Sequence, residues 1–504
     1  MGRLERNTFA NLAGAVWSIA LGVACVPLQL RLMGVEAFGL VGVFITLQSA
    51  VAVLDIGISV TLNRELARLS AGGGDARRPR DLVFTLQAVY WLIALAAGVA
   101  VVAAAPALAR HWVRSQSLPV ESVGNSVRMM GFALALQFPF SFYQGGLYGL
   151  QRHVLLNGLG VALAALRGPG IVLALWLASP APAVFFAGQV AVSAAGTGAV
   201  AVLLWRCLPG AAAGAARFDP ALIRDVWRFS AASAASSVAN LGLRQGDNLV
   251  LSRLLPLGDF GYYTLARGIA NGLFAVIISV NGATFPQFSE LVARGGGAEL
   301  SRVYHRAGQL MAVVLAPAAV LAAIFSRELL TLWTGDPVIV ENTRLILTLV
   351  VAGMLLHGLA QGPRFLQIAH GRWRLILASN AVLLLSIIPL YVLAARRAGG
   401  PGAAAVWVLL NFCYMLTVPL MHRSLLRGEL WRWLFGDVCL PVGGALAVGA
   451  AARWLMPGGL SRPAIAAYLV GAGLPALAAA AALSSQLRAP LLARLRRAAE
   501  PFVA

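Results

Sequence analysis

Long apolar segments alternate with short polar breaks along the whole chain. Each apolar segment runs for roughly 18 to 25 residues, the length that a helix needs to cross the hydrocarbon core of a bilayer. Because a lone strand cannot satisfy its backbone in lipid, we predict that these segments are helical. The pattern indicates an all-α polytopic membrane protein with about 14 transmembrane helices. The segments lie near residues 10–30, 38–58, 82–108, 125–148, 156–178, 182–204, 228–252, 259–284, 307–326, 342–363, 375–395, 402–421, 434–455 and 463–485.

Composition supports this class and excludes several others. Of the 504 residues, 59% are hydrophobic and 12% are charged, against roughly 25% charged in an ordinary soluble domain. The four cysteines lie far apart in apolar runs, which argues against a disulfide scaffold. All 39 Lys and Arg positions are arginine, so the chain has no Walker A lysine. The net charge of +20 does not indicate nucleic-acid binding, because the arginines punctuate apolar segments instead of forming one basic face.

The distribution of arginine predicts the orientation of the chain. With the N-terminus inside, the cytoplasmic segments hold about 25 arginines and the opposite side about nine. The positive-inside rule then places both termini in the cytoplasm. The first apolar segment follows Arg3 and Arg6, as in a signal peptide, but it is long and joins the repeating pattern. We interpret it as an uncleaved span, and the short loops leave no room for a nucleotide-binding domain.

The chain contains an internal repeat. The turn between two spans reads R-L-x(5)-F-G twice, beginning at Arg31 and at Arg253, an offset of 222 residues. Trp112 and Trp333 follow at an offset of 221. Two parallel six-span repeats are typical of alternating-access transporters, although an old duplication can also leave a static bundle. We predict an N-terminal six-helix lobe (1–205), a cytoplasmic linker (206–227), a C-terminal six-helix lobe (228–421), two additional transmembrane helices (434–485) and a cytoplasmic tail (486–504).

Five arginines lie inside the predicted spans, where a guanidinium at mid-depth costs at least about 2.5 kcal/mol. Arg167 lies near the middle of its span, and Arg267 lies about a third of the way along the eighth span. Neither has an acidic residue within one turn of its own helix, so we predict that both line a cavity. Pairing between helices is the alternative for each.

The other three arginines have local explanations as well. Arg244 lies three residues before Asp247, a spacing that favours an ion pair along one helix. Arg128 and Arg344 lie close enough to the outer ends of their spans to reach the interface. The candidate substrate-binding residues are therefore Arg167, Arg267, Arg128 and Arg244.

Two carboxylates, Asp55 and Asp247, are identified as the only clear ones within spans, and we treat them as candidate coupling or gating groups. For Asp55 three explanations stay open: protonation during transport, pairing with a cytoplasmic arginine, and capping of the span end. Five arginines against two carboxylates favour an anionic, phosphorylated substrate over a cationic drug. Of the six histidines only His357 is placed within a span, and none has metal-ligand spacing, so we predict no metal or cofactor.

Several short motifs occur around the first two spans and around the seventh and eighth. They are Asn11, Trp17, Pro27, Arg31-Leu-Met-Gly34, Phe38-Gly39-Leu40, Leu54-Asp55-Ile56-Gly57, Asn63-Arg64-Glu65, Asp247-Asn248-Leu249-Val250 and Phe260-Gly261-Tyr262-Tyr263-Thr264-Leu265-Ala266. These motifs resemble the polysaccharide flippases, the Wzx-like branch of the multidrug/oligosaccharidyl-lipid/polysaccharide exporter superfamily. The resemblance implies a V-shaped bundle of twelve spans plus two in a bacterial inner membrane. It also implies that the protein moves undecaprenyl-pyrophosphate-linked oligosaccharide to the periplasmic leaflet through a cationic cavity, onto which Arg167 and Arg267 would map.

Three other functions stay open. A drug/cation antiporter should carry more buried carboxylates than arginines, and the reverse is predicted here. A lipid II flippase should carry an Arg-Asp pair soon after its first span, where this chain has Gly34-Val35-Glu36-Ala37. A polyprenyl-linked glycosyltransferase needs acidic catalysts in an outer loop, where only Glu36 lies. We therefore predict a transporter and not an enzyme. Its partners would be an anionic lipid-linked oligosaccharide, membrane lipids, H+ or Na+ as coupling ion and a polysaccharide polymerase, with no nucleic acid.

Overall fold

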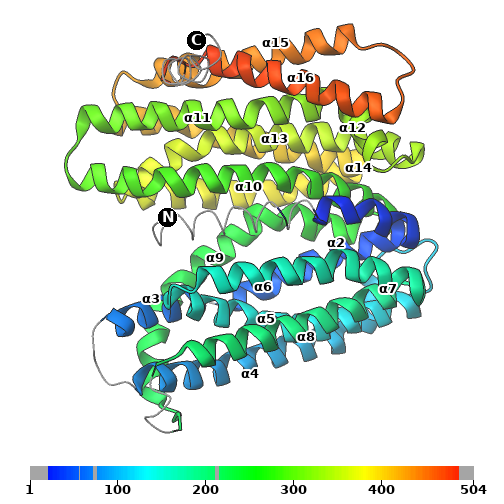
Figure 1. Cartoon of the computed structure of the whole chain (residues 1–504), viewed down its shortest axis with the longest axis vertical. Helices are drawn as coiled ribbons and strands as arrows, with labels where there is room; N and C mark the ends of the chain where they lie inside the picture. The colour runs from blue at the N-terminus through cyan, green and yellow to red at the C-terminus, as the bar shows by residue number, and fades with distance from the viewer. Residues whose placement is uncertain are drawn as a thin grey trace, which may run out of the picture. The chain divides into compact units, whose positions relative to one another are not determined.

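The structure is a computed structural model that describes residues 21–55, 57–71, 77–209 and 215–486, together with Trp17 and Arg488. These residues are almost entirely helical, and no strand occurs among them (Figure 1). The all-α fold predicted from the sequence is therefore confirmed. Residues 10–16 and 18–20 of the first predicted span and most of the C-terminal tail lie outside the described residues.

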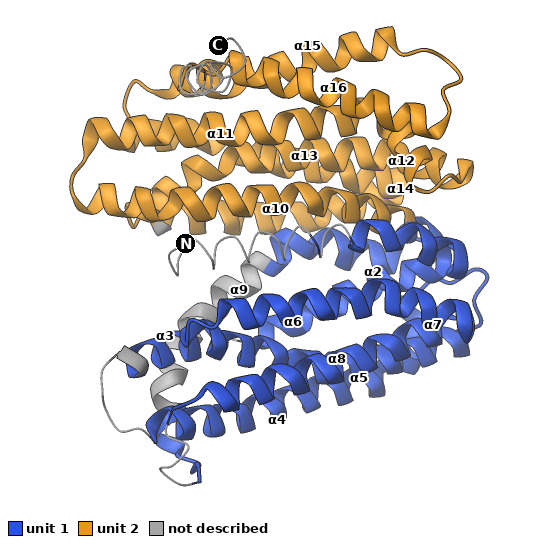
Figure 2. Ribbon diagram, viewed as in Figure 1, with its two compact units in different colours: residues 1–261 blue, residues 262–504 orange. Residues whose placement is uncertain are grey.

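The chain divides into two compact units, residues 1–261 and 262–504 (Figure 2). Unit 1 begins its described part with a short apolar helix, Leu21–Met33. The first turns of α10 (Leu257–Ala293) also belong to it. Its other elements are α2 (Val35–Ala52), η1 (Val53–Asp55), α3 (Ile58–Ala71), α4 (Arg78–Ala107), η2 (Leu108–Trp112), α5 (Val120–Gly149), α6 (His153–Ala165), η3 (Leu166–Gly170), α7 (Ile171–Leu177), α8 (Pro182–Cys207) and α9 (Pro220–Leu254).

Unit 2 holds the rest of α10 and the helices that follow it. The long helix α14 (Trp373–Leu425) is two helices joined at a bend, because Ala398 and Gly399 leave helical geometry and Gly399 has φ of 58°. Glycine suits this position, since other residues rarely adopt positive φ. The remaining elements of the unit are α11 (Gly297–Ile324), α12 (Ser326–Trp333), α13 (Pro337–Ala369), η5 (Arg432–Cys439), α15 (Leu440–Leu455) and α16 (Arg462–Ala482).

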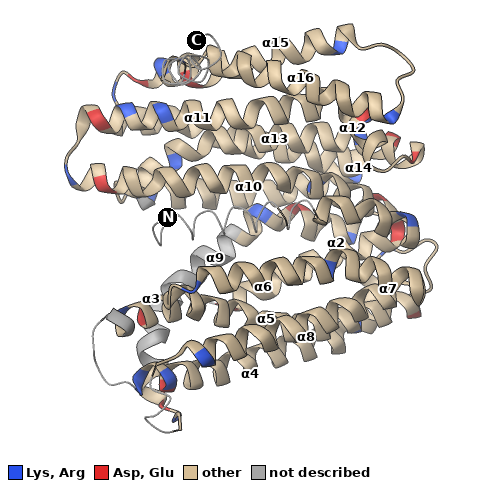
Figure 3. Ribbon diagram, viewed as in Figure 1, with Lys and Arg blue, Asp and Glu red and all other residues tan. Residues whose placement is uncertain are grey.

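Helix covers the described part of each predicted span, yet the count of fourteen is not confirmed. Among the described residues, ten helices are long and apolar enough to cross a membrane. One of them, Ile376–Leu425, contains two predicted spans on either side of the bend. Charged residues gather toward the helix ends within each unit, and the long central stretches carry few of them (Figure 3).

Local sequence explains where several helices begin. Asp219 precedes Pro220, and its carboxylate accepts a hydrogen bond from the Ala221 backbone N–H at 2.9 Å. Asp336 precedes Pro337 and accepts from the Val338 backbone N–H at 2.8 Å. An acidic N-cap followed by proline satisfies a free backbone donor and fixes the first helical φ. The start of α9 therefore falls at Pro220, within the segment predicted as a linker.

Two short helices were not anticipated from the pattern. Helix α3 follows Asp55 where a loop was expected, and α12 follows α11. On α5, a Cβ added to Gly145 would lie 2.6 Å from the carbonyl oxygen of Ser59 on α3. A Cβ added to Gly149 would lie 2.5 Å from the carbonyl oxygen of Asn63 on the same helix. Small residues four apart allow such close approach between helices. The packing of α3 on α5 therefore depends on these glycines, not on a long apolar run.

The repeated R-L-x(5)-F-G turns contact each other reciprocally within unit 1. A Cβ on Gly39 would lie 2.2 Å from the Leu257 carbonyl oxygen. A Cβ on Gly261 would lie 2.4 Å from the carbonyl oxygen of Val35, the residue that matches Leu257 in the repeat. The glycine of each turn therefore lies against the start of the helix that follows the other turn. This reciprocal contact indicates a local twofold arrangement of the two turns.

The contact-based units do not follow the predicted lobe boundaries. Helix α9, assigned to the C-terminal lobe from the sequence, contacts α2, α3 and α4 and lies in unit 1. The boundary between the units falls at Gly261, not within residues 206–227. The predicted six-helix lobes were defined by the sequence repeat, and the division of the chain into these lobes stays a prediction.

Candidate functional site

A polar pocket lies within unit 2, between α13 and both halves of α14. The space free of atoms in and around it is about 450 Å³, which includes open solvent. The helices around it belong to the apolar segments Pro337–Ala369 and Ile376–Leu425, which are long enough to span a membrane. A cluster of polar groups in such segments indicates binding or helix association. The polar lining includes His357, Gln361, Arg364, Gln367, Asn380 and Tyr414.

Hydrogen bonds fix the side chains on one wall of the pocket. His357 Nδ1 is 2.9 Å from Asn411 Oδ1, and His357 Nε2 is 2.7 Å from Gln361 Nε2. The Asn411 amide also donates to the Trp407 carbonyl at 2.8 Å. Both ring nitrogens of His357 therefore have a side-chain hydrogen-bond partner. These bonds hold polar groups in place without using an ion pair.

Arg364 lies at the mouth of this polar wall. Its guanidinium stacks over the Tyr414 ring, with 5.5 Å from Cζ to the ring centroid. Tyr414 in turn donates a hydrogen bond from its hydroxyl to Asn380 Oδ1 at 3.0 Å. The apolar pattern ended the span at residue 363, but α13 continues to Ala369. A helical stripe of polar residues at i, i+4 and i+7, namely His357, Gln361 and Arg364, could have revealed this site from the sequence.

Arg267, a candidate from the sequence, connects to the same wall through an aromatic ring. Its Cζ lies 4.9 Å from the centroid of Trp407, and the ring of His357 packs 5.9 Å from that of Trp407. A guanidinium over an indole face gains electrostatic attraction and keeps its N–H donors at the edge of the plane. Arg267 and Arg364 therefore flank one polar region of unit 2.

Arg167, the other main candidate, lies in unit 1 and does not share this pocket. It belongs to the π-helical segment η3, together with Pro169. A proline removes a helix donor, and π-helical turns often accompany functional sites. The side chain is half-buried, and its Nε is buried with no hydrogen-bond partner among the described residues. The structure thus places a guanidinium inside the apolar helix His153–Leu177.

The remaining candidate arginines are exposed in their own units. Arg128 donates from Nη1 to Asn125 Oδ1 at 2.6 Å, one turn earlier on α5. Arg244 on α9 is exposed, whereas Asp247 on the same helix is 1% exposed and accepts from the Asn248 backbone N–H at 2.8 Å. These positions contact substrate only if cargo reaches the helix surfaces, and that assignment stays a prediction.

Asp55 caps a helix start, one of the three explanations offered from the sequence. Its Oδ1 accepts from the Ser59 backbone N–H at 3.1 Å, and its Oδ2 accepts from the Ser59 hydroxyl at 2.5 Å. The buried Tyr90 hydroxyl on α4 donates to Oδ1 at 2.8 Å. Asp55 thereby joins η1, α3 and α4.

Two statements about buried ionisable groups were wrong. Asp437 in η5 is a third carboxylate within a predicted span, and it is 1% exposed. His357 is not the only histidine inside a span, since His305 on α11 and His422 on α14 are both buried. The pattern missed His305 because it began the span at residue 307, whereas α11 begins at Gly297.

Comparison with known proteins agrees with this fold. Residues 4–292 match the model of a family described as polysaccharide biosynthesis protein. The lipid II flippase MurJ, in an inward closed conformation, aligns over 95% of this chain and 98% of its own, with a TM-score of 0.70 and 12% identity. An inward-facing multidrug resistance MATE family transporter of the MOP superfamily aligns over 83% and 94%, with a TM-score of 0.61 and 13% identity. No curated protein matches the chain by sequence.

The family match spans more than half of the chain and includes both turns of the repeat. The two solved structures show the same fold, although their low identity carries no information about substrate. The resemblance to the exporter superfamily found in the sequence is confirmed. The chain belongs to the polysaccharide biosynthesis protein family of the multidrug/oligosaccharidyl-lipid/polysaccharide exporter (MOP) superfamily.

Proposed function

We propose that this protein is a flippase that moves an undecaprenyl-pyrophosphate-linked oligosaccharide across the bacterial inner membrane. The cargo would serve the synthesis of a surface polysaccharide, such as O-antigen, capsule or exopolysaccharide. The family description and the flippase and transporter folds support a transport function. They fit a protein that is not an enzyme.

The observation that carries this proposal is the arginine-flanked polar pocket in unit 2. Arg267 and Arg364 lie in the apolar helices α10 and α13, where a cation is costly unless it serves a ligand or a water-filled cavity. Their guanidinium groups lie beside aromatic rings, and a guanidinium binds phosphate oxygens through the N–H groups in its plane. The pocket amides and hydroxyls beside them offer hydrogen bonds to sugar hydroxyls.

Directional transport needs an energy source outside this chain. The absence of lysine rules out a Walker A site, so ATP hydrolysis by a P-loop in this chain is excluded. An H+ or Na+ gradient, or consumption of the cargo by a polysaccharide polymerase, would then bias alternating access. Arg167 in unit 1 would offer a second cationic contact, and the arginine distribution supports cytoplasmic termini.

A proteoliposome assay tests the proposal. The purified protein is reconstituted with a fluorescent polyprenyl-pyrophosphate oligosaccharide, and the fraction accessible from one leaflet is followed with time. Arg364→Ala and Arg267→Ala should slow crossing at least about tenfold, because a charge-assisted phosphate contact is worth roughly 1.5–3 kcal/mol. Arg372→Ala is the matched control, since Arg372 is exposed at the start of α14. Normal crossing by both folded variants would refute the site.

A lipid II flippase is the second candidate, favoured by the fold shared with MurJ over nearly the whole chain. Lipid II and the proposed cargo share a polyprenyl pyrophosphate, so the same arginines would serve either. The assay therefore includes lipid II and a cationic dye as separate cargoes. Crossing of the dye alone would favour a drug/cation antiporter. Transfer of the glycan to an added acceptor, with release of polyprenyl pyrophosphate, would favour the less supported glycosyltransferase.

A further inference from the structure

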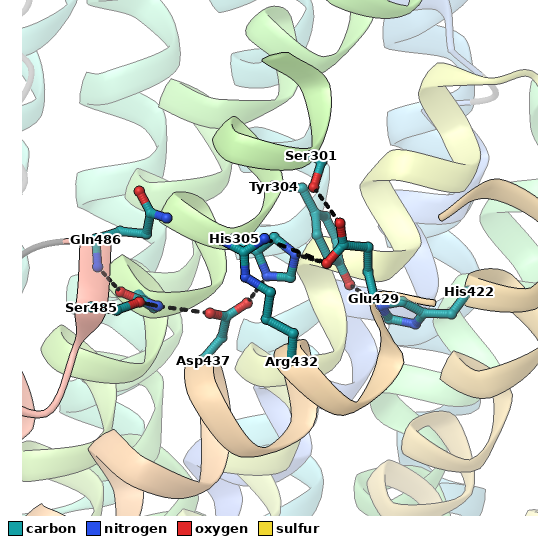
Figure 4. A network of polar contacts seen from close by, with 10 residues as sticks. Ser301, Tyr304, His305, His422, Glu429, Arg432, Asp437, Ser485 and Gln486 are labelled. Carbon is teal, nitrogen blue, oxygen red and sulfur yellow. Dashed lines mark hydrogen bonds and ion pairs between the residues drawn. The ribbon is translucent and has the colours of Figure 1, made fainter. Parts of the chain in front are cut away.

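Three segments of unit 2, namely α11, η5 and the turn before η5, meet at a buried histidine that does not line the pocket. His305 on α11 is fully buried. Its Nδ1 contacts Asp437 Oδ2 in η5, and its Nε2 lies 3.1 Å from Glu429 Oε2, just before η5 (Figure 4). The Asp437 side chain is 1% exposed and that of Glu429 is 27% exposed. One imidazole therefore bridges two carboxylates in a largely dry setting.

Gln309 extends this cluster to the end of the described chain. Its Nε2 donates to Asp437 Oδ1 at 2.8 Å and to Ser485 Oγ at 3.0 Å. Its Oε1 accepts from the Gln486 backbone N–H at 2.8 Å. The amide thus links α11 to η5 and to the residues after α16. Asp437 has both oxygens occupied, one by the histidine and one by this amide.

The other titratable groups around His305 are few. On α11, Tyr304 contacts His422 of α14 at 3.3 Å, and Ser301 donates to Glu429 at 3.1 Å. Arg432 of η5 lies 3.5 Å from Glu429, and the residues after α16 that touch the cluster, Ser485 and Gln486, are neutral. The two carboxylates are therefore the only acidic groups in contact with His305 among the described residues.

The geometry fixes how many protons the cluster must hold. A carboxylate oxygen accepts only, and a neutral imidazole has one N–H. Two nitrogen–oxygen contacts need two hydrogens, one in each. They come from an imidazolium between two carboxylates, or from a neutral imidazole with one protonated carboxyl group. Both arrangements hold two protons and carry a net charge of about −1 on the three groups.

We propose that His305, Asp437 and Glu429 form a proton-binding site that fastens η5, α15 and α16 to α11. Loss of one of the two protons leaves a nitrogen lone pair facing a carboxylate oxygen, and this is most unfavourable at Asp437, whose side chain is 1% exposed. An unsatisfied buried polar group is strongly unfavourable. The attachment of the two additional helices therefore weakens as the pH rises. This inference is independent of the proposed cargo.

Asp437→Asn is the decisive variant. The asparagine amide can donate to His305 Nδ1 while its carbonyl oxygen still accepts from Gln309. The neutral imidazole then donates from Nε2 to Glu429, so the whole cluster is satisfied without the extra proton. Glu429→Gln achieves the same at the other contact, where its oxygen can still accept from Ser301. Each variant keeps the connections and removes the need for a bound proton.

The experiment is thermal unfolding of the purified full-length protein in detergent, from about pH 6 to about pH 10. The wild type should lose at least about 3 °C of melting temperature at the alkaline end relative to Asp437→Asn. Hydrogen exchange in peptides of α15 and α16, corrected for intrinsic pH dependence, should accelerate in the wild type and less so in the variant. Parallel pH profiles for both proteins would overturn the proposal. If Asp437→Asn does not fold, Glu429→Gln provides the same comparison, and a flat wild-type profile alone would also refute it.

Discussion

Two polar regions, the Asp55 network in unit 1 and the pocket in unit 2, are held in different ways. In unit 1 the Asp55 carboxylate receives hydrogen bonds from uncharged groups, Ser59 and Tyr90. In unit 2 the buried polar groups include cations on aromatic rings, Arg267 over Trp407 and Arg364 over Tyr414. The first arrangement gives its charged group three hydrogen bonds from the same unit. The second places each guanidinium over the face of an aromatic ring.

This difference assigns separate roles to similar residue types. A carboxylate surrounded by short hydrogen bonds from its own bundle is held in place and stabilises helix packing. A guanidinium whose face is stacked keeps planar N–H donors that can grip an oxyanion. We therefore expect the Asp55 network to matter for stability and the pocket of unit 2 to matter for cargo. Three experiments can break or sharpen this contrast.

The largest effect is expected for Asp55→Ala. The substitution removes the cap of α3 and leaves the Ser59 backbone N–H without its acceptor. It also takes one of two partners from the Tyr90 hydroxyl, which lies 2.8 Å from Ser141 Oγ as well. Loss of a cap and of a buried acceptor should lower the free energy of unfolding by about 3 kcal/mol. The measurement is the melting temperature and the yield of monodisperse protein in detergent.

Asp55→Asn is the control that tests function. It keeps one acceptor oxygen, so its stability should fall less, and crossing of lipid-linked oligosaccharide per folded molecule should stay near the wild-type rate. A folded Asp55→Asn protein that no longer transports would show that Asp55 is a coupling carboxylate. The contrast between the units would then be wrong.

Trp407→Leu should have the next largest effect. Trp407 is buried and supports both Arg267 and His357. Losing the ring costs packing and the cation–π contact, about 2 kcal/mol together, and it frees Arg267 from its position. Stability and proteoliposome crossing should both fall.

Trp205→Leu in unit 1 is the matched control. Trp205 lies under Arg80, with 5.3 Å from Cζ to the ring, and donates to Gln87 at 3.2 Å. Its removal should lower stability by a similar amount but leave crossing by the folded protein unchanged. An equal loss of transport in both variants would mean that any stacked arginine matters, whichever unit holds it.

The fold was predictable because span length and apolarity are set by the bilayer. Apolar runs of the right length predicted helices wherever the structure describes them, and the arginines on them were visible as exceptions. The sequence also showed that Arg267 and Arg167 are charged residues within apolar segments. It did not show that Arg267 rests on Trp407, because this contact joins residues 140 positions apart.

The errors arose at the ends of apolar runs. Arg364 and His305 both lie on helices that extend beyond the hydrophobic window, so a rule based on hydropathy placed them in loops. Asp437 was overlooked because its neighbours Gly436 and Val438 read as an ordinary span start. Such residues are polar yet buried. Whether a polar residue near the end of an apolar run is buried depends on how distant helices pack against it.

The smallest effect concerns Glu429, which lies between the spans Ile376–Leu425 and Arg432–Leu455. Burial raises its pKa, but the hydrogen bond from Ser301 and the charges of His305 and Arg432 outweigh this, so the pKa is lower than usual. A carboxyl group with a lowered pKa stabilises the folded state above its ordinary pKa, and this stability is lost as the pH falls through the lowered value. At neutral pH the gain is below about 1 kcal/mol, since the group is partly exposed.

Glu429→Gln should therefore be slightly less stable than the wild type near neutral pH, and the difference should vanish as acid protonates Glu429. The gap in melting temperature between the two proteins, followed from neutral pH to about pH 3, measures this directly. A gap that stays constant in acid would mean that the carboxylate charge contributes nothing. Because the alkaline limb depends on the second proton of the His305 cluster, the wild-type advantage should be confined to a window around neutral pH. The hydrogen bonds of Asp55 in unit 1 are unaffected by this substitution, so any change in the profile belongs to unit 2.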